Sequence, residues 1–193
     1  MRLFYPLLLS FAFVGLTTVY SPAQQPNGEL PEEARKRLEH AIGKWEVTTK
    51  FYNADGEVIR ENKGIDTNRY VIPGRLIEHN IANSEGVTTA RGQMFYNVRE
   101  EKFCVTSVDA NGDLWILTGG LDTFVLTSRP REQPNGTVMM VRFTHENIEE
   151  DSFEAQMEIS RDGGETWRKG YRQFIKRLEE GDDATEVGVD LSR

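Results

Sequence analysis

Residues 153–167, Phe-Glu-Ala-Gln-Met-Glu-Ile-Ser-Arg-Asp-Gly-Gly-Glu-Thr-Trp, contain the pattern that decides the fold. Apolar and polar residues alternate through the first half, with Phe153, Ala155, Met157 and Ile159 separated by Glu154, Gln156 and Glu158. A period of two is typical of a strand with one buried and one solvent-facing side. The Gly163-Gly164 pair then marks a turn, and a second strand is expected over 166–176. The stretch therefore predicts an antiparallel hairpin.

The turn of this hairpin carries a motif with two possible meanings. Residues 160–167 fit Ser-x-Asp-x-Gly-x-Thr-Trp, the pattern called an Asp box in sialidases and other β-propeller proteins. A propeller needs several repeats of about 40 residues, and sialidase chemistry needs an arginine cluster with a Tyr/Glu pair, whereas this chain has one copy of the motif. We therefore expect a structural turn. Asp162 accepts hydrogen bonds from turn amides, the glycines supply positive φ, and Trp167 packs back over the hairpin.

The same alternation continues through most of the chain and indicates an all-β protein. Turn dipeptides such as Asp55-Gly56 and Asn111-Gly112 separate the alternating segments, as in antiparallel meanders. Strands are expected near 44–52, 57–63, 65–71, 75–82, 91–97, 102–108, 113–119, 122–129, 136–145 and 151–159, with 166–176 closing the chain. A sheet of about ten strands removes its exposed edges by closing, so we predict an antiparallel up-and-down β-barrel. A two-sheet sandwich is the alternative.

One helix precedes the strands. Pro31 suits the first turn, Glu32 and Glu33 suit the positive end of the helix dipole, and Gly43 ends the segment. Within 31–42 the apolar residues recur at helical spacing. We expect this N-terminal helix to cover one end of the barrel.

The N-terminus has the features of an export signal. Arg2 precedes an apolar stretch, and Ser21-Pro22-Ala23 places small residues at the positions that signal peptidase requires. We predict a signal peptide over 1–23, a flexible leader over 24–30, a barrel domain over 31–178 and an acidic disordered tail over 179–193. The protein is then secreted or periplasmic, with no stable membrane insertion after cleavage. An uncleaved membrane anchor is the alternative.

Charge and cysteine content exclude several classes of partner. With 31 acidic against 23 basic residues, the net charge of −8 opposes binding to nucleic acid. The single cysteine, Cys104, leaves no internal disulfide and no cysteine-based metal site. The sequence leaves the oligomeric state open.

Several short strings resemble the DUF1579 family of bacterial proteins, within the lipocalin-like (calycin) group. They are Leu38-x3-Ile42-Gly43-x-Trp45, Gly74-Arg75-Leu76-Ile77-Glu78, Gly92-x3-Tyr96-Asn97, Gly119-Gly120-Leu121-Asp122 and the Asp-box-like turn. The resemblance implies a lipocalin-like barrel with an internal cavity and implies no established reaction.

Aromatic and arginine side chains are the first candidates for a ligand site. Trp45, Trp115 and Phe143 lie on alternating faces and are expected to contact a small apolar or amphipathic ligand in the barrel interior. Arg75 and Arg142 would fix an anionic head group if they point inward. The alternative is that they form cross-strand ion pairs on the outside, Arg75 with Glu78.

Histidines supply an alternative function. His79 and His145 share strand faces with apolar residues, and neutral histidine is a common axial ligand of haem; nitrobindin-type barrels use a histidine in this way. The other interpretation is a histidine bonded to its neighbours or placed at the rim, and His40 is expected on the exposed face of the helix. No catalytic residue and no metal site are predicted, and no cofactor is expected unless haem binds.

The predicted function is therefore an exported barrel that binds a small apolar or amphipathic ligand. The alternatives are a haem-binding or otherwise enzymatic barrel (isomerase or redox), and a structural barrel that holds no ligand.

Overall fold

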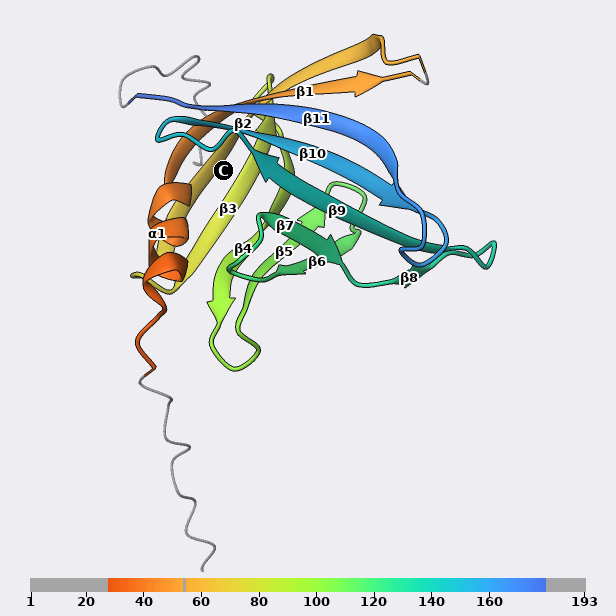
Figure 1. The fold of residues 1–193 in the computed structure, drawn as a ribbon. Coiled ribbons are helices and arrows are strands. Elements are labelled where there is room, and N and C mark those ends of the chain that lie inside the picture. The colour runs from red at the N-terminus through yellow and green to blue at the C-terminus, as the bar shows by residue number, and fades with distance from the viewer. Residues whose placement is uncertain (1–27, 54, 180–193) are drawn as a thin grey trace, which may run out of the picture.

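The computed structural model describes residues 28–53 and 55–179. Figure 1 shows a β-barrel with a short helix along one end. In chain order the elements are α1 (Glu32–Ala41), β1 (Gly43–Tyr52), β2 (Val58–Ile72), β3 (Leu76–Asn83), β4 (Thr88–Asn97), β5 (Lys102–Asp109), β6 (Leu114–Gly119), β7 (Val125–Ser128), β8 (Arg131–Glu132), β9 (Val138–Glu146), β10 (Ser152–Ser160) and β11 (Arg168–Arg177).

All strand pairings in the described ranges, 28–53 and 55–179, are antiparallel apart from one isolated parallel bridge, and they close into a ring. The order is β10-β11-β1-β2-β3-β4-β5-β6-β7-β9, and the pairing of β9 with β10 completes it. The two-residue strand β8 adds to β9 outside this ring. The up-and-down barrel of about ten strands with one N-terminal helix is thus confirmed, and the sandwich is excluded. Closure leaves no unpaired edge in the ring.

One expected boundary between strands is wrong. Two strands are expected over 57–63 and 65–71, but the structure has one continuous strand, β2. Gly64 lies within it, opposite Val47 of β1 and Asn83 of β3. A Cβ at Gly64 would lie 2.4 Å from the carbonyl oxygen of Ala82. This glycine therefore permits close approach of β2 to β3 and does not make a turn.

The motif at 160–167 joins β10 to β11 as a structural turn. Ser160 Oγ donates to Asp162 Oδ1 at 2.6 Å, and the amide of Thr166 donates to the same oxygen at 2.9 Å. Trp167 Nε1 donates to the carbonyl oxygen of Gly164 at 3.0 Å, and both glycines have positive φ. These hydrogen bonds hold the pKa of the Asp162 carboxyl well below its usual range. The expected turn geometry is confirmed.

The helix packs on the barrel through one apolar face. Ala34 and Leu38 are fully buried and form a cluster with Ile77, Tyr96 and Phe103 of β3, β4 and β5. The exposed side carries ion pairs one turn apart, Lys36 with Glu32 and Arg35 with Glu39, each at 2.9 Å. Helix α1 therefore covers the end of the barrel at which β1 begins (Figure 1).

The other half of the interior is filled by side chains. Leu117, Val141 and Met157 form a buried cluster, against which Trp115, Phe143 and Tyr171 also pack. Strand register places this cluster away from α1, since Tyr171 lies opposite Phe51 near the end of β1. The barrel is consequently packed at one end and covered by a helix at the other.

The predicted signal peptide over 1–23 lies outside the described residues, as does nearly all of the predicted tail. Of the helical structure that is described, none is long and apolar enough to cross a membrane.

Candidate functional site

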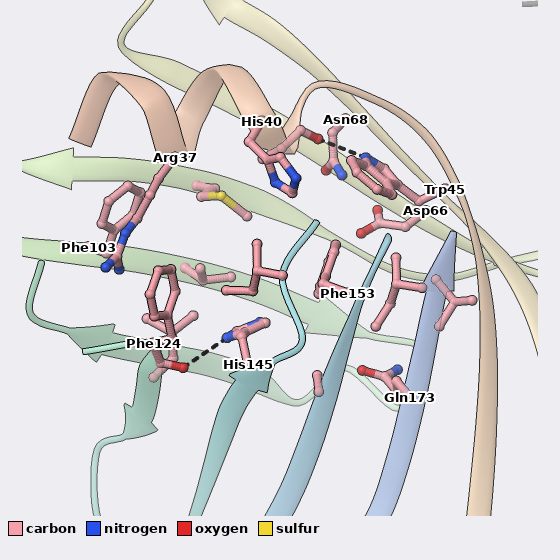
Figure 2. A pocket seen from close by; sticks show the side chains of 18 of the residues that line it. Arg37, His40, Trp45, Asp66, Asn68, Phe103, Phe124, His145, Phe153 and Gln173 are labelled. Carbon is pink, nitrogen blue, oxygen red and sulfur yellow. Dashed lines mark hydrogen bonds between the residues drawn. The ribbon is translucent and has the colours of Figure 1, made fainter. Parts of the chain in front are cut away.

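A cavity of about 390 Å³ lies inside the barrel beneath α1. Figure 2 shows its walls, to which inward-facing side chains of nine strands and of the helix contribute. Most of them are apolar, among them Val47, Ile81, Met94, Phe103, Val105, Leu126, Phe153 and Ile175. Exposed members of the lining lie on α1 and on two loops, at Lys36, Phe124 and Ile148. The cavity therefore opens to solvent where the helix meets these loops.

Two polar side chains of β2 point into this apolar space. Asp66 and Asn68 are two residues apart on the inward face, beside Trp45 (Figure 2). Asn68 is only 7% exposed, and although part of Asp66 faces the cavity, its Oδ1 atom is fully buried. Within residues 28–53 and 55–179, neither Asp66 Oδ1 nor Asn68 Oδ1 has a hydrogen-bond partner. Burial raises the pKa of the Asp66 carboxyl, while the charge of His79 and a hydrogen bond from Asn68 oppose that shift.

His145 lies on the opposite wall with a defined tautomer. Its Nδ1 atom is 3.1 Å from the carbonyl oxygen of Phe124, and because a carbonyl can only accept, Nδ1 carries the hydrogen. Burial lowers the pKa of His145, so the ring is neutral near pH 7. Its Nε2 atom then holds a lone pair and can accept a hydrogen bond or bind a metal.

Arg37 ties the helix to the loop at 120–123. Its guanidinium donates to the carbonyl oxygens of Gly120, Leu121 and Thr123, and it stacks 4.1 Å above the ring centre of Phe124. Its Nε atom is buried without a hydrogen-bond partner in the described part of the chain. Most donors of this arginine are thus used to hold α1 over the cavity.

The expectation for His40 is wrong. His40 lines the cavity, where its Nε2 donates to the carbonyl oxygen of Glu149 at 2.8 Å. Its ring lies 5.4 Å from that of Trp45 and 6.1 Å from that of Phe153. The last turn of α1 faces the barrel rather than solvent, because the helix lies across the open end.

The three predicted aromatic residues all face the interior, at different depths. Trp45 lines the cavity, is 1% exposed and donates from Nε1 to Ala41 at 3.0 Å. Phe143 packs below the cavity between two apolar clusters. Trp115 lies in the filled half, with its Nε1 donating to Asp109 Oδ2 at 3.1 Å. The structure therefore brings Trp45 and His145 to the cavity wall, but neither Phe143 nor Trp115.

His79 also faces the interior, but its ring is enclosed by protein. It is 5% exposed, and Nε2 donates to the carbonyl oxygen of Thr106 at 3.0 Å. Its neighbour across the strands is Gly92, where an added Cβ would lie 2.6 Å from His79 Nε2. Gly92 thus makes room for the imidazole, which does not line the cavity.

Both predicted arginines lie outside the cavity, which corrects the expectation of an inward guanidinium. Arg142 alternates with the inward residues of β9; its Nε donates to Glu158 Oε2 at 2.6 Å, and the group stacks 4.3 Å above Trp167. Arg75 is exposed in the turn before β3 and donates to the carbonyl oxygen of Gly28 at 3.0 Å. Glu78, its expected partner, instead pairs with Arg69 and Arg91. Parity along β9, set by the register of the whole barrel, turns Arg142 outward, whereas Arg75 lies before β3 begins.

No set of three or more metal-binding side chains (His, Cys, Asp or Glu) is grouped to hold an ion within the described residues. The candidate site is therefore the cavity beneath α1 and its few polar groups.

Comparison with known proteins agrees with this architecture. The family model for DUF1579, described as a protein of unknown function, matches residues 30–176. The chain belongs to the DUF1579 family. No curated protein matches it.

Three solved structures are similar to this chain to different degrees. The structure of Rv2717c from M. tuberculosis is 11% identical and superposes with a TM-score of 0.52, over 78% of this chain and 100% of the other. An S-type phycobiliprotein lyase, CPES from Guillardia theta, is 12% identical, with a TM-score of 0.46 over 75% and 92%. A de novo designed fluorescence-activating β-barrel is 16% identical, with a TM-score of 0.39 over 73% and 96%. For this DUF1579 chain, the first of these matches supports the barrel fold.

Three polar residues of the cavity, Asp66, Asn68 and Arg37, were not foreseen from the sequence. Asp66 and Asn68 lie in a segment that is hydrophilic on both faces, so alternation does not distinguish inward from outward positions there. Arg37 lies on the helix between charged neighbours. The pairing of the strands is the signal that could have revealed Asp66. It lies opposite Trp45 and Ile81, which are apolar and face inward, so Asp66 faces inward as well.

Proposed function

We propose that this protein is an exported barrel that binds one small apolar or amphipathic molecule in the cavity beneath α1. The observation that carries the proposal is the cavity itself, about 390 Å³ of mainly apolar wall interrupted by a few polar groups. Small-molecule sites in proteins have this composition and begin at about 300 Å³. The mouth between α1 and the loops gives a ligand a path from solvent.

The alternative, a structural barrel that holds no ligand, accounts for the filled half of the interior better than for the half under α1. The half around Leu117 is filled, as a purely structural core would be. The half under α1 holds Asp66 Oδ1 and Asn68 Oδ1 without hydrogen-bond partners among the residues described. An unpaired buried polar atom costs about 1–3 kcal/mol, a cost that a bound molecule with suitable donors removes.

Mass spectrometry of small molecules retained through native purification tests the proposal. We expect one apolar or amphipathic compound at a stoichiometry near one per chain. The cavity-filling variant Ile81→Trp should lose this compound, because Ile81 lines the cavity. Val108→Trp is the matched control, since Val108 is 48% exposed on the outside of β5. Equal retention by both variants would place the compound elsewhere and refute the proposal.

Export rests on the predicted signal peptide. We expect the mature protein recovered from outside the cytoplasm to begin near Gln24. An intact N-terminus at Met1 on an exported, membrane-bound protein would favour the uncleaved anchor.

Haem binding is the second candidate, favoured by the lone pair of His145 Nε2 at the cavity wall. His79 is less suitable, because its Nε2 is already bonded to Thr106 and its ring lies behind the wall. His145 is therefore the residue that would hold the iron, and haem would supply the redox or isomerase chemistry.

A further inference from the structure

The two oxygens of β2 without partners define what the polar part of a ligand must supply. Asp66 Oδ1 and Asn68 Oδ1 are both acceptors that lack a hydrogen-bond partner among the described residues. Both side chains face the cavity, and Asn68 is more than nine-tenths buried. Accordingly, this part of the wall offers acceptors, and a ligand that contacts it has to bring N–H or O–H donors.

The acidity of Asp66 narrows the choice of donor, because burial raises its pKa and its ionised form therefore needs a positive partner. No lysine or arginine forms a salt bridge with Asp66 in the described ranges. The residues opposite Asp66 on β1 and β3 are Trp45 and Ile81, which are both apolar. His79, on the neighbouring strand, gives electrostatic attraction, but its Nε2 hydrogen is donated to Thr106. A buried carboxylate without a direct cationic partner is best compensated by a positive donor group. A hydroxyl supplies one hydrogen and no charge, whereas an ammonium group supplies three hydrogens and the charge.

An anionic head group fits the cavity less well. Arg37 is the arginine that lines the cavity, and a carboxylate would need its two parallel N–H donors. Its Nη1 and Nη2 groups already donate to the carbonyl oxygens of Gly120, Leu121 and Thr123, which leaves Nε as the guanidinium nitrogen without a hydrogen-bond partner among the described residues. Binding an anion there would break the contacts that hold α1 over the cavity, and the anion would also face the Asp66 carboxylate.

We infer that the cavity takes an amphipathic amine, whose ammonium group bonds to Asp66 and Asn68 while its apolar body fills the space beneath α1. This inference rests on the proposed function and names the chemical class of its ligand. The apolar walls at Ile81, Met94 and Phe153 accommodate the body of the molecule. The net charge of −8 favours approach of a cation.

Isothermal titration calorimetry at pH 7 with octylammonium, octan-1-ol and octanoate tests the head group, because the three probes share one apolar chain. We expect octylammonium to bind at least about tenfold more tightly than octan-1-ol, the factor that one hydrogen bond to a charged group provides. Octanoate should bind most weakly. Asp66→Asn keeps the shape of the side chain and should reduce the affinity for octylammonium to within about threefold of that for octan-1-ol. Asp113→Asn, at an aspartate that pairs with Arg131 outside the cavity, is the matched control and should change none of the three affinities.

The possible outcomes separate this inference from the proposed function. Equal affinity for octylammonium and octan-1-ol, tighter binding of octanoate, or an amine preference that survives in Asp66→Asn overturns the choice of an amine. If octan-1-ol still binds and Ile81→Trp abolishes its binding, the cavity remains a ligand site. If none of the probes binds, the amine inference fails, and retention of a native molecule decides the proposed function separately.

Discussion

Replacing Leu38 by alanine tests whether α1 is an integral part of the barrel. Leu38 is fully buried and, with Ala34, is the main apolar contact of the helix with Ile77, Tyr96 and Phe103. The substitution removes three carbon atoms from the centre of this cluster. Because the surrounding strands are tied to one another by the closed ring, they cannot collapse fully into the space that remains.

The expected loss of stability is about 3 kcal/mol, within the range of about 2–5 kcal/mol for buried leucine to alanine. For a domain of this size, each kcal/mol lowers the melting temperature by about 2–4 °C, so the shift should be about 6–12 °C. The polar contacts of Arg37 and His40 remain in this variant, so the cost is assigned to packing alone.

Urea unfolding followed by circular dichroism measures the change, and Arg35→Ala is the control. Arg35 is exposed and pairs with Glu39 on the helix surface, so its removal should cost less than about 0.5 kcal/mol. A loss below about 1 kcal/mol in Leu38→Ala would show that the helix opens independently of the barrel, and would refute the reasoning that it forms a fixed roof over the cavity.

Three further predictions concern single residues. Asp66→Asn should raise the stability of the ligand-free protein at pH 7, because the amide has the shape of the carboxyl group and cannot ionise. Because burial raises the pKa of Asp66, this residue destabilises the folded protein only above a pH of about 3.9, the pKa of aspartate in the unfolded chain. The gain in stability of Asp66→Asn should therefore vanish in thermal melts below that pH. An equal gain at pH 7 and at the lower pH would contradict the view that ionisation of Asp66 is the source of the cost. Asp162→Ala should lower the melting temperature by opening the turn between β10 and β11, whereas loss of sugar binding without loss of stability would mean the turn is not structural. If haem titration gives a Soret band, His145→Ala should abolish it and His79→Ala should not; a band unaffected by either change would rule out both histidines.

The class of fold was accessible from the sequence because its signals are local. Alternation such as that of 152–159 requires only that neighbouring side chains of a strand point to opposite faces. Asn-Gly and Asp-Gly pairs encode turns within a few residues, as the positive φ at Gly56 and Gly112 shows. The one mistaken strand boundary, at Gly64, arose because a glycine that permits close approach looks the same in sequence as one that makes a turn.

The site was less accessible because the inward face of each strand is a property of the closed ring. His145 and Trp45 were selected by their apolar neighbours and do line the cavity. The side on which Arg142 lies could not be chosen from the sequence, since its strand is apolar on both faces and only the partner strands β7 and β10 decide which face is enclosed.

By itself, the sequence determined the all-β class, the number of strands within one, the helix and the turn at 160–167, all of which depend on interactions between residues near one another in the chain. Tertiary structure alone decided where the interior is hollow and which polar groups enter it. Asp66, Arg37 and His145 come from three distant parts of the chain, and they share one cavity only because the ring closes and α1 lies across its open end. That arrangement depends on the register of every strand pair, which no single stretch of sequence contains.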